Sequence, residues 1–203
     1  RIALNDLLTN RTISALHRLQ WLTQSPALTS APPPPVGSLR NPADVQFLLS
    51  QAQYRLGMDS AFRISAEEVL AKGPPRYAPL IRAQLLLSAY RSGNFQRVAE
   101  LARTMPADQT RGLASLVSGL ADYELGNYPQ AQARFAEAKR TGPPYAQYAE
   151  YMDVLATLRA DTSRSTLAIT RLETLAMSSS GNFADQVRLT AAQLAYERGD
   201  YAK

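Results

Sequence analysis

The sequence predicts an all-α fold built from repeated helical hairpins, and three observations lead to this prediction. Alanine, leucine, arginine and glutamine dominate the 203 residues, and all four favour helices. A Tyr-x-x-Gly string recurs at intervals of about 34 residues, the length of a helix–turn–helix repeat. Glycine and proline interrupt otherwise helical segments, as in "GNYP" and "TGPP", where they end one helix and begin the next.

The N-terminal segment, residues 1–25, is expected to form one helix. Its apolar stripe is made by Leu4, Leu8, Ile13, Leu16 and Leu19. The following residues, 26–42, contain four consecutive prolines, which favour extended polyproline II. A spacer of this kind reaches on the order of 50 Å, so the helix need not pack on its nearest repeat.

Three interpretations of this N-terminal region stay open. The helix is either the end of a preceding repeat or upstream domain, or a docking helix that binds a partner or another copy of the chain. The proline run is alternatively a ligand for a domain that recognises polyproline.

The repeats are expected in residues 43–203. Four tyrosines each precede a glycine by three residues, and the glycine spacings are 36, 33 and 73 residues, the last being about two units. The pairs are Tyr54–Gly57, Tyr90–Gly93, Tyr123–Gly126 and Tyr196–Gly199. The predicted units are 43–76, 79–111, 112–145, 146–184 and an incomplete 185–203.

Residues 112–145 show the physics of one unit most clearly. "GLASLVSGLADYEL" is predicted as the first helix and "PQAQARFAEAKR" as the second. Ala131, Phe135 and Ala138 fall on one face of the second helix. Small residues such as Gly119 and Ala131 allow the two antiparallel helices to approach closely.

The "GNYP" corner joins these two helices. Gly126 can adopt the left-handed conformation that ends a helix, Asn127 is a suitable cap for the next one, and Pro129 fits its first turn. "TGPP" is predicted to stop the second helix, because proline cannot continue it. The unit 146–184 lacks the corner glycine and is expected to end in a long "MSSSGN" loop.

This pattern resembles the tetratricopeptide repeat (TPR) family. The match is most specific at Gly119, Gly126, Tyr128, Ala131, Phe135, Ala138 and Pro143. The resemblance implies a right-handed superhelical solenoid in which the first helix of each unit lines a concave face. It implies a binding surface for a protein or peptide formed by Phe47, Tyr54, Arg55, Leu87, Tyr90, Arg91, Leu116, Leu120, Tyr123 and Tyr196. The repeated tyrosine either packs the helix pair or contacts the ligand.

The composition argues against nucleic-acid binding, metal or catalytic sites, and a membrane span. The net charge is +5, but the basic residues are spread along the chain without a cluster of four, so we expect no nucleic-acid partner. There is no cysteine, and His17 is the single histidine, so we expect no metal site, no catalytic triad and no cofactor. No apolar run approaches the roughly 18–20 residues of a membrane span.

The leading interpretation is a non-enzymatic scaffold in a bacterial cell-envelope assembly or secretion complex. Arginine outnumbers lysine 19 to 3, which indicates a GC-rich bacterial genome, and the lack of cysteine suits the periplasm; the cytoplasm is the alternative. A second hypothesis is an accessory repeat domain of a larger envelope enzyme, a metallopeptidase or lytic transglycosylase. The ends "RIALNDLL" and "YERGDYAK" favour a fragment of a longer protein. A third hypothesis is self-association through the N-terminal helix.

Overall fold

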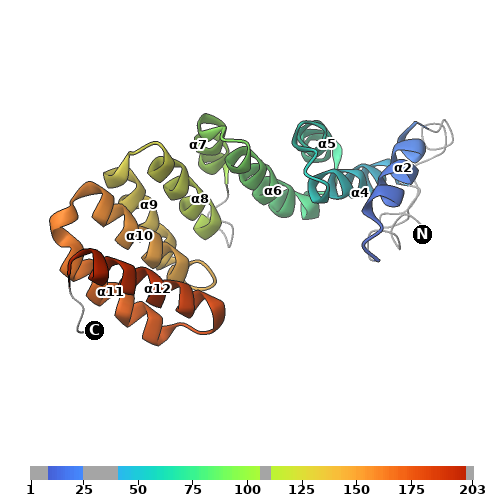
Figure 1. The fold of residues 1–203 in the computed structure, drawn as a ribbon. Helices are drawn as coiled ribbons and strands as arrows, with labels where there is room; N and C mark the ends of the chain where they lie inside the picture. The colour runs from blue at the N-terminus through green and yellow to red at the C-terminus, as the bar shows by residue number, and fades with distance from the viewer. Residues whose placement is uncertain (1–8, 25–40, 106–110, 200–203) are drawn as a thin grey trace. The chain divides into compact units, whose positions relative to one another are not determined.

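The chain is all-helical in the residues that the computed structural model describes, which are 9–24, 41–105 and 111–199 (Figure 1). These ranges hold ten α-helices, two short 3₁₀-helices and no strand, which confirms the all-α prediction. The helices are α2 (Thr12–Thr23), α4 (Pro42–Arg55), α5 (Asp59–Lys72), η1 (Pro75–Tyr77), α6 (Ala78–Arg91), α7 (Phe95–Thr104), α8 (Arg111–Glu124), α9 (Tyr128–Arg140), α10 (Ala146–Ala160), η2 (Thr162–Arg164), α11 (Ser165–Ser178) and α12 (Gly181–Glu197).

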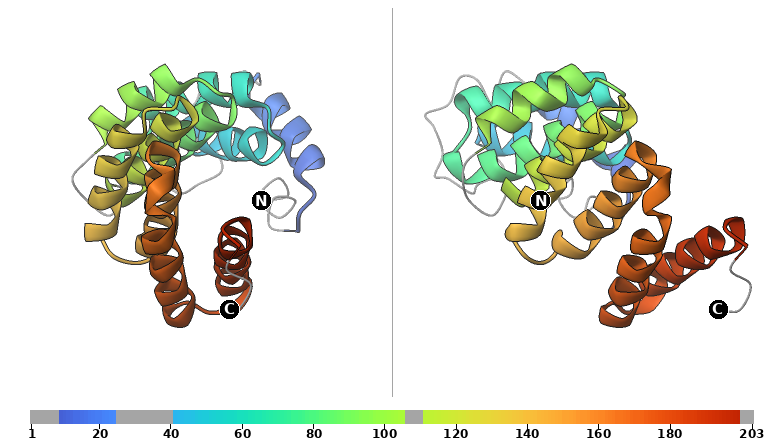
Figure 2. Two further views of the ribbon diagram at one scale, coloured as in Figure 1. Left: turned by 60° about the vertical axis from the view of Figure 1, so that its left-hand side comes forward. Right: turned by 90° about the vertical axis from the view of Figure 1, so that its left-hand side faces the viewer.

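The chain divides into two compact units, Arg1–Ser92 and Gly93–Lys203. The division falls between α6 and α7, inside the repeat predicted at 79–111. In the first unit α2 packs on α4, α4 on α5, and α5 on α6. In the second unit each helix from α7 to α12 packs on the next one, and Figure 2 shows α11 and α12 lying alongside each other. Successive helices thus pair in the way that a helical repeat requires.

The helix starts follow a regular period. The helices predicted to open each hairpin begin at Pro42, Ala78, Arg111, Ala146 and Gly181, which lie 33 to 36 residues apart. This spacing agrees with the period read from the glycines. The TPR type and the superhelical solenoid remain predictions.

The "GNYP" corner forms largely as predicted. Gly126 has a φ of +77°, and its N–H donates to the carbonyl of Tyr123 over 3.0 Å. The N–H of Asn127 reaches back to the carbonyl of Asp122 over 2.8 Å, so the corner satisfies carbonyls left open at the end of α8. Pro129 lies in the first turn of α9. Asn127 stands at the cap position, but its side chain does not bond to the helix, so the predicted side-chain cap is wrong.

A different device makes the corner between α10 and α11, where glycine is missing. The N–H and the hydroxyl of Ser163 both donate to Oδ1 of Asp161, over 3.0 and 2.6 Å. Nε of Arg164 donates to Oδ2 over 3.2 Å. These hydrogen bonds, led by the Ser163 hydroxyl, lower the pKa of Asp161. An aspartate and a 3₁₀ turn therefore replace the left-handed glycine.

The predicted long loop after α11 is wrong. Only Ser179 and Ser180 separate α11 from α12, because α11 continues to Ser178 and α12 begins at Gly181. Gly181 turns the chain with a φ of +62°. The start predicted near Asp185 accordingly falls inside α12.

The N-terminal segment is not one continuous helix. Asn10 has a φ of +61° in a turn, and α2 begins only at Thr12; asparagine tolerates this left-handed conformation better than most residues. Leu4 and Leu8 lie outside the described residues. The predicted stripe is correct at Leu16 and Leu19, which are buried, and wrong at Ile13, which is 62% exposed.

Helix α2 packs on its nearest repeat despite the long spacer. Leu16 and Leu19 join Val45 and Leu49 of α4 in one apolar cluster. The spacer also ends earlier than predicted, since Pro42 is already in α4 and Asn41 caps it through a bond from the Ala43 N–H. The apolar face of α2 is therefore buried within its own chain.

The seam between α8 and α9 depends on one glycine. A Cβ at Gly119 would lie 2.6 Å from Cε1 of Phe135, which is fully buried together with Ala131 and Ala138. The prediction that small residues allow a close approach is confirmed at Gly119. The Phe135 ring occupies the space that a larger residue would need.

We predict that Gly119→Ala destabilises the protein by about 1–3 kcal/mol, because the added methyl overpacks a closed seam. Urea denaturation followed by circular dichroism measures the change. Phe135→Leu in the same chain should recover part of the loss. The control is Gly126→Ala, where the space is open and the roughly 1–2 kcal/mol cost comes from the left-handed backbone, so Phe135→Leu gives no recovery. An unchanged stability for Gly119→Ala would contradict the seam.

An ionic network joins α9, α10 and α11. Nζ of Lys139 lies 2.8 Å from Glu150 and 2.9 Å from Asp153, and Arg171 lies 2.6 Å from each of the same two carboxylates. Burial opposes ionisation of Glu150, but hydrogen bonds from Lys139 and Arg171 outweigh it and lower its pKa. Two cations and two anions from three helices therefore neutralise one another.

We predict that Glu150→Gln destabilises the protein by about 1–2 kcal/mol at pH 7, a charged hydrogen-bond value reduced for partial exposure. A carboxylate with a lowered pKa stabilises the fold above its unfolded pKa and stops doing so as pH falls through its folded pKa. The difference between the variant and the parent should therefore shrink below about pH 4. The control is Asp185→Asn, which removes an exposed pair with Arg188 and should change stability by less than about 0.5 kcal/mol. Equal effects of both variants would argue against the network.

Candidate functional site

In the first unit, aromatic and charged side chains meet where α4 begins. The rings of Phe47 and Tyr77 stack with centroids 3.9 Å apart and planes 5° apart. The Tyr77 hydroxyl donates to Oδ1 of Asp44 over 2.5 Å, and Arg76 reaches the same oxygen over 3.2 Å. Asp44 is almost fully buried, so these two donors compensate a carboxylate that has lost most of its water.

The pKa values follow from these contacts. Burial raises the pKa of Tyr77, and its hydrogen bond to Asp44 raises it further. The hydrogen bond to Tyr77, followed by the charge interactions with Tyr77 and then Asp44, raises the pKa of Arg76 against the opposing effect of burial. Tyr77 therefore stays a neutral donor at physiological pH, and the cluster keeps one fixed hydrogen-bond arrangement.

The same face continues along α4 and α6 through a pair of amides. Nε2 of Gln51 donates to Oε1 of Gln84 over 2.8 Å, and Nε2 of Gln84 returns the bond to Gln51 over 2.8 Å. Gln84 is buried and Gln51 is partly buried. The reciprocal bonds fix the register of the two helices.

At the far end of this face, Tyr54 lies between a ring and a cation. Its ring centroid is 5.0 Å from that of Phe62, and Cζ of Arg91 lies 4.7 Å from it on the Tyr54 face. Arg91 also pairs with Asp59 over 3.0 Å, and the Ser88 hydroxyl donates to Asp59 over 2.5 Å. The ion pair with Asp59 therefore holds the Arg91 guanidinium in its position over the Tyr54 ring.

The structure thus brings Phe47, Tyr54 and Arg91 to one face of the first unit. Arg55 is exposed at the end of α4, and Leu87 and Tyr90 are partly buried on α6. Phe47, Tyr54 and Arg91 have packing partners that hold their side chains in place. Their binding role stays a prediction.

In the second unit the residues predicted to bind a ligand are more buried in the core than those of the first unit. Leu116 is only 7% exposed and belongs to the main core, against which Leu120 and Tyr123 also pack. The Tyr123 ring meets Tyr128 edge-on at 5.6 Å, and its hydroxyl accepts from Nε of Arg159 over 3.3 Å. Leu116 is therefore a core residue, and it is too buried to contact a ligand directly.

Tyr196 differs from the other tyrosines. It is 70% exposed on α12, and Leu189 on the same helix is also exposed. Within the described residues no further helix follows α12. The repeated tyrosine therefore lies in different environments along the chain.

In each of the two units, one of the repeated tyrosines interacts with an arginine. Arg91 lies over Tyr54, and Arg159 donates to Tyr123; in both cases the arginine is at the end of the next opening helix. Sequence reasoning did not identify Arg159 or this pairing. Both arginines are the fourteenth residue of their helices, so an alignment on the helix starts Ala78 and Ala146 places them at one position.

Tyr77 was also missed, although a repeated string marks it. Tyr77 follows "GPPR" and Tyr145 follows "GPP", each directly before an opening helix. Tyr145 plays a related part, since a Cβ at Gly112 of α8 would lie 2.7 Å from its ring. The string places an aromatic ring against the start of the preceding opening helix.

The described residues contain neither a candidate metal site nor a helix suited to cross a membrane. Within ranges 9–24, 41–105 and 111–199, no three His, Asp or Glu side chains are grouped to hold a metal ion. None of the helices in those ranges is long and apolar enough to cross a bilayer. His17 is exposed on α2.

Comparison with protein families, curated proteins and solved structures gives no match for this chain.

We predict that Tyr77→Phe lowers stability by about 1–2 kcal/mol, because a buried Asp44 loses its shortest hydrogen bond while the ring stack is kept. Chemical denaturation of the two proteins measures the loss. Tyr148→Phe is the matched control, since its partly exposed hydroxyl has no hydrogen bond within the described residues, and its change should stay below about 0.5 kcal/mol. If the two variants were equally stable, the Asp44 bond would have no structural role.

Proposed function

We propose that the chain is a non-enzymatic protein-interaction scaffold that binds a partner protein or peptide along the faces of its opening helices. The observation that carries this proposal is the face formed by α4 and α6. Stacking, reciprocal amide bonds and a cation over a ring hold its side chains in fixed positions.

Fixed aromatic side chains suit recognition for two reasons. Tyrosine and phenylalanine offer a large apolar area together with, in tyrosine, a polar edge, and such residues dominate binding energy at interfaces. A surface that is already ordered loses less conformational entropy on binding. Phe47, Tyr77 and Tyr54 meet both conditions in the first unit.

The mixture of side chains indicates the kind of ligand. The Gln51–Gln84 pair offers amide groups between two aromatic ends, and Arg91 and Asp59 add charge. An extended peptide or an amphipathic helix can use both apolar and amide contacts on such a face. The TPR resemblance, the cell-envelope setting and the periplasmic location belong to this proposal and rest on the sequence.

We predict that a photoreactive amino acid placed at Arg55, Leu87 or Tyr196 yields a discrete crosslinked partner in the native host. These positions are exposed or partly buried on α4, α6 and α12. Gel analysis and mass spectrometry identify the product. A partner crosslinked from Arg55 and Leu87 supports the face of the first unit, and the same partner from Tyr196 supports the exposed face of α12 in the second unit.

Matched positions on other helices provide the control. Ile64 on α5 and Leu167 on α11 are exposed on the second helices of their predicted hairpins, lie outside the groove of the second unit, and should give no product. Crosslinking of equal yield at these controls, or none at the three test positions, contradicts the proposed surface.

A further inference from the structure

A groove in the second unit lies outside the surface proposed above. It has a volume of about 700 Å³ and is formed by α7 and α9 on its sides and α8 at its floor. The floor consists of small residues of α8, Ala114, Ser115, Ser118 and Ala121, all buried. Because these four side chains are small, the space between α7 and α9 remains open. Its volume is in the range of sites that bind ligands.

The two walls of the groove differ in character. The α7 wall is largely apolar, with Val98, Ala99 and Ala102. The α9 wall carries Arg134 and Glu137. A segment that is apolar on one side and polar on the other would match both walls.

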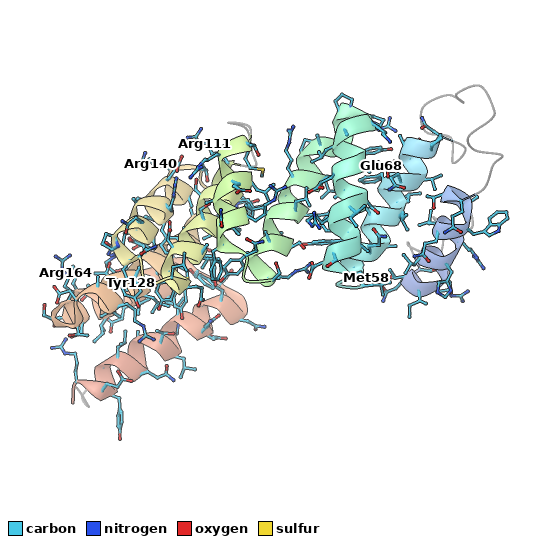
Figure 3. All side chains as sticks on the ribbon, turned by 90° about the horizontal axis from the view of Figure 1, so that it is seen from above. Met58, Glu68, Arg111, Tyr128, Arg140 and Arg164 are labelled. Carbon is cyan, nitrogen blue, oxygen red and sulfur yellow. The ribbon has the colours of Figure 1, made fainter. Side chains whose placement is uncertain are left out.

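The rim is basic. Arg103 of α7 and Arg134 of α9 are exposed, and neither forms an ion pair within the described residues. Arg111 pairs with Glu137 over 2.9 Å, and this bond lowers the pKa of Glu137 (Figure 3 labels Arg111). The other carboxylate, Asp122, is partly buried; burial raises its pKa, and the charge of Arg134 opposes that rise. Three arginines, Arg103, Arg111 and Arg134, therefore line the groove with two carboxylates, which leaves it a net positive charge.

An unpartnered polar group supplies independent support. Ser118 lines the groove and is 7% exposed, and among the residues that the structure describes its hydroxyl has no hydrogen-bond partner. Buried polar groups in folded proteins nearly always have a partner. The floor therefore has unused hydrogen-bonding capacity.

We propose that this groove binds an acidic amphipathic helix of a partner protein. From Arg111 to Asp122 the floor helix rises about 16 Å, the length of three helical turns. Leucine or alanine side chains of the guest would pack on α7, and its carboxylates would meet Arg103 and Arg134 on opposite walls. Guanidinium groups form strong, directional bonds with carboxylates. The proposal is independent of the face formed by the opening helices.

The test uses the full chain and a fluorescein-labelled, capped 14-residue helical peptide of Leu, Ala and Glu, with Leu on one face. Fluorescence anisotropy should show saturable binding that weakens with salt. The same peptide with every Glu replaced by Lys should bind at least about tenfold more weakly. A labelled single-stranded oligonucleotide of equal charge serves as the nucleic-acid probe and should bind less tightly than the acidic peptide.

Variants of the groove then locate the binding. Arg103→Glu with Arg134→Glu should weaken binding at least about tenfold, from the charged bonds lost. Arg140→Glu is the matched control, since this arginine is exposed on α9 and unpaired within the described residues but does not line the groove, and it should leave the affinity within about twofold. Ala99→Trp fills the groove without changing charge and should also abolish binding. Circular dichroism confirms that each variant folds.

Three outcomes overturn the proposal: no saturable binding of the acidic peptide, equal weakening by Arg140→Glu, or tighter binding of the oligonucleotide. The two proposals fail separately. An Arg55→Glu/Tyr196→Ala variant, changed at exposed positions of the predicted binding face, should keep full affinity for the acidic peptide, whereas loss of affinity in that variant would place the peptide on that face and overturn the groove assignment.

Discussion

Every described α-helix in this chain is between 10 and 17 residues long, and helices of this length are marginal in water by themselves. Their stability therefore comes from burying a face against the neighbouring helices in the chain. In the second unit α8, α9, α10 and α11 each pack on the helix before and the helix after them, and α7 and α12 each pack on one neighbouring helix of the described residues. This constraint explains why corners are tight and why small residues occur at seams, since any gap between neighbours removes the support on which each helix depends.

The same constraint gives the tyrosine positions a structural part as well as a proposed binding part. Tyr54 and Tyr123 each interact with an arginine from the next opening helix, so they couple adjacent repeats. A ligand on that face would contact side chains whose orientation the repeat packing already sets. Packing and recognition are then linked by the same residues, and a truncation to alanine affects both; exposed positions such as Arg55 separate the two effects better.

The repeat period of the sequence predicted those features of the fold that a few neighbouring residues determine. The glycine corners and the α8–α9 hairpin formed as expected because a left-handed residue and a proline act within a few residues of chain. The corner at Asp161 and the short α11–α12 junction were not predicted, because a side chain or a two-residue turn can replace glycine without a repeated signal. For the candidate site, the repeat alignment predicted which positions lie on the face but not which side chains contact them. Its partners Tyr77, Gln84 and Arg159 come from other helices, and one sequence does not encode which side chains meet across a seam.

Helix α8 shows why the groove escaped sequence reasoning. Leu116, Leu120 and Tyr123 recur at intervals of four and three residues and build the core, and Ala114, Ser118 and Ala121 recur with the same intervals two residues earlier. At roughly 100° per residue, a shift of two residues places the second stripe on nearly the opposite face. A search for large apolar residues detects the first stripe and overlooks the second, because its residues are small. Small residues are nevertheless what a helix needs on a face that must accept another helix, so the second stripe favours an occupied groove over a bare surface.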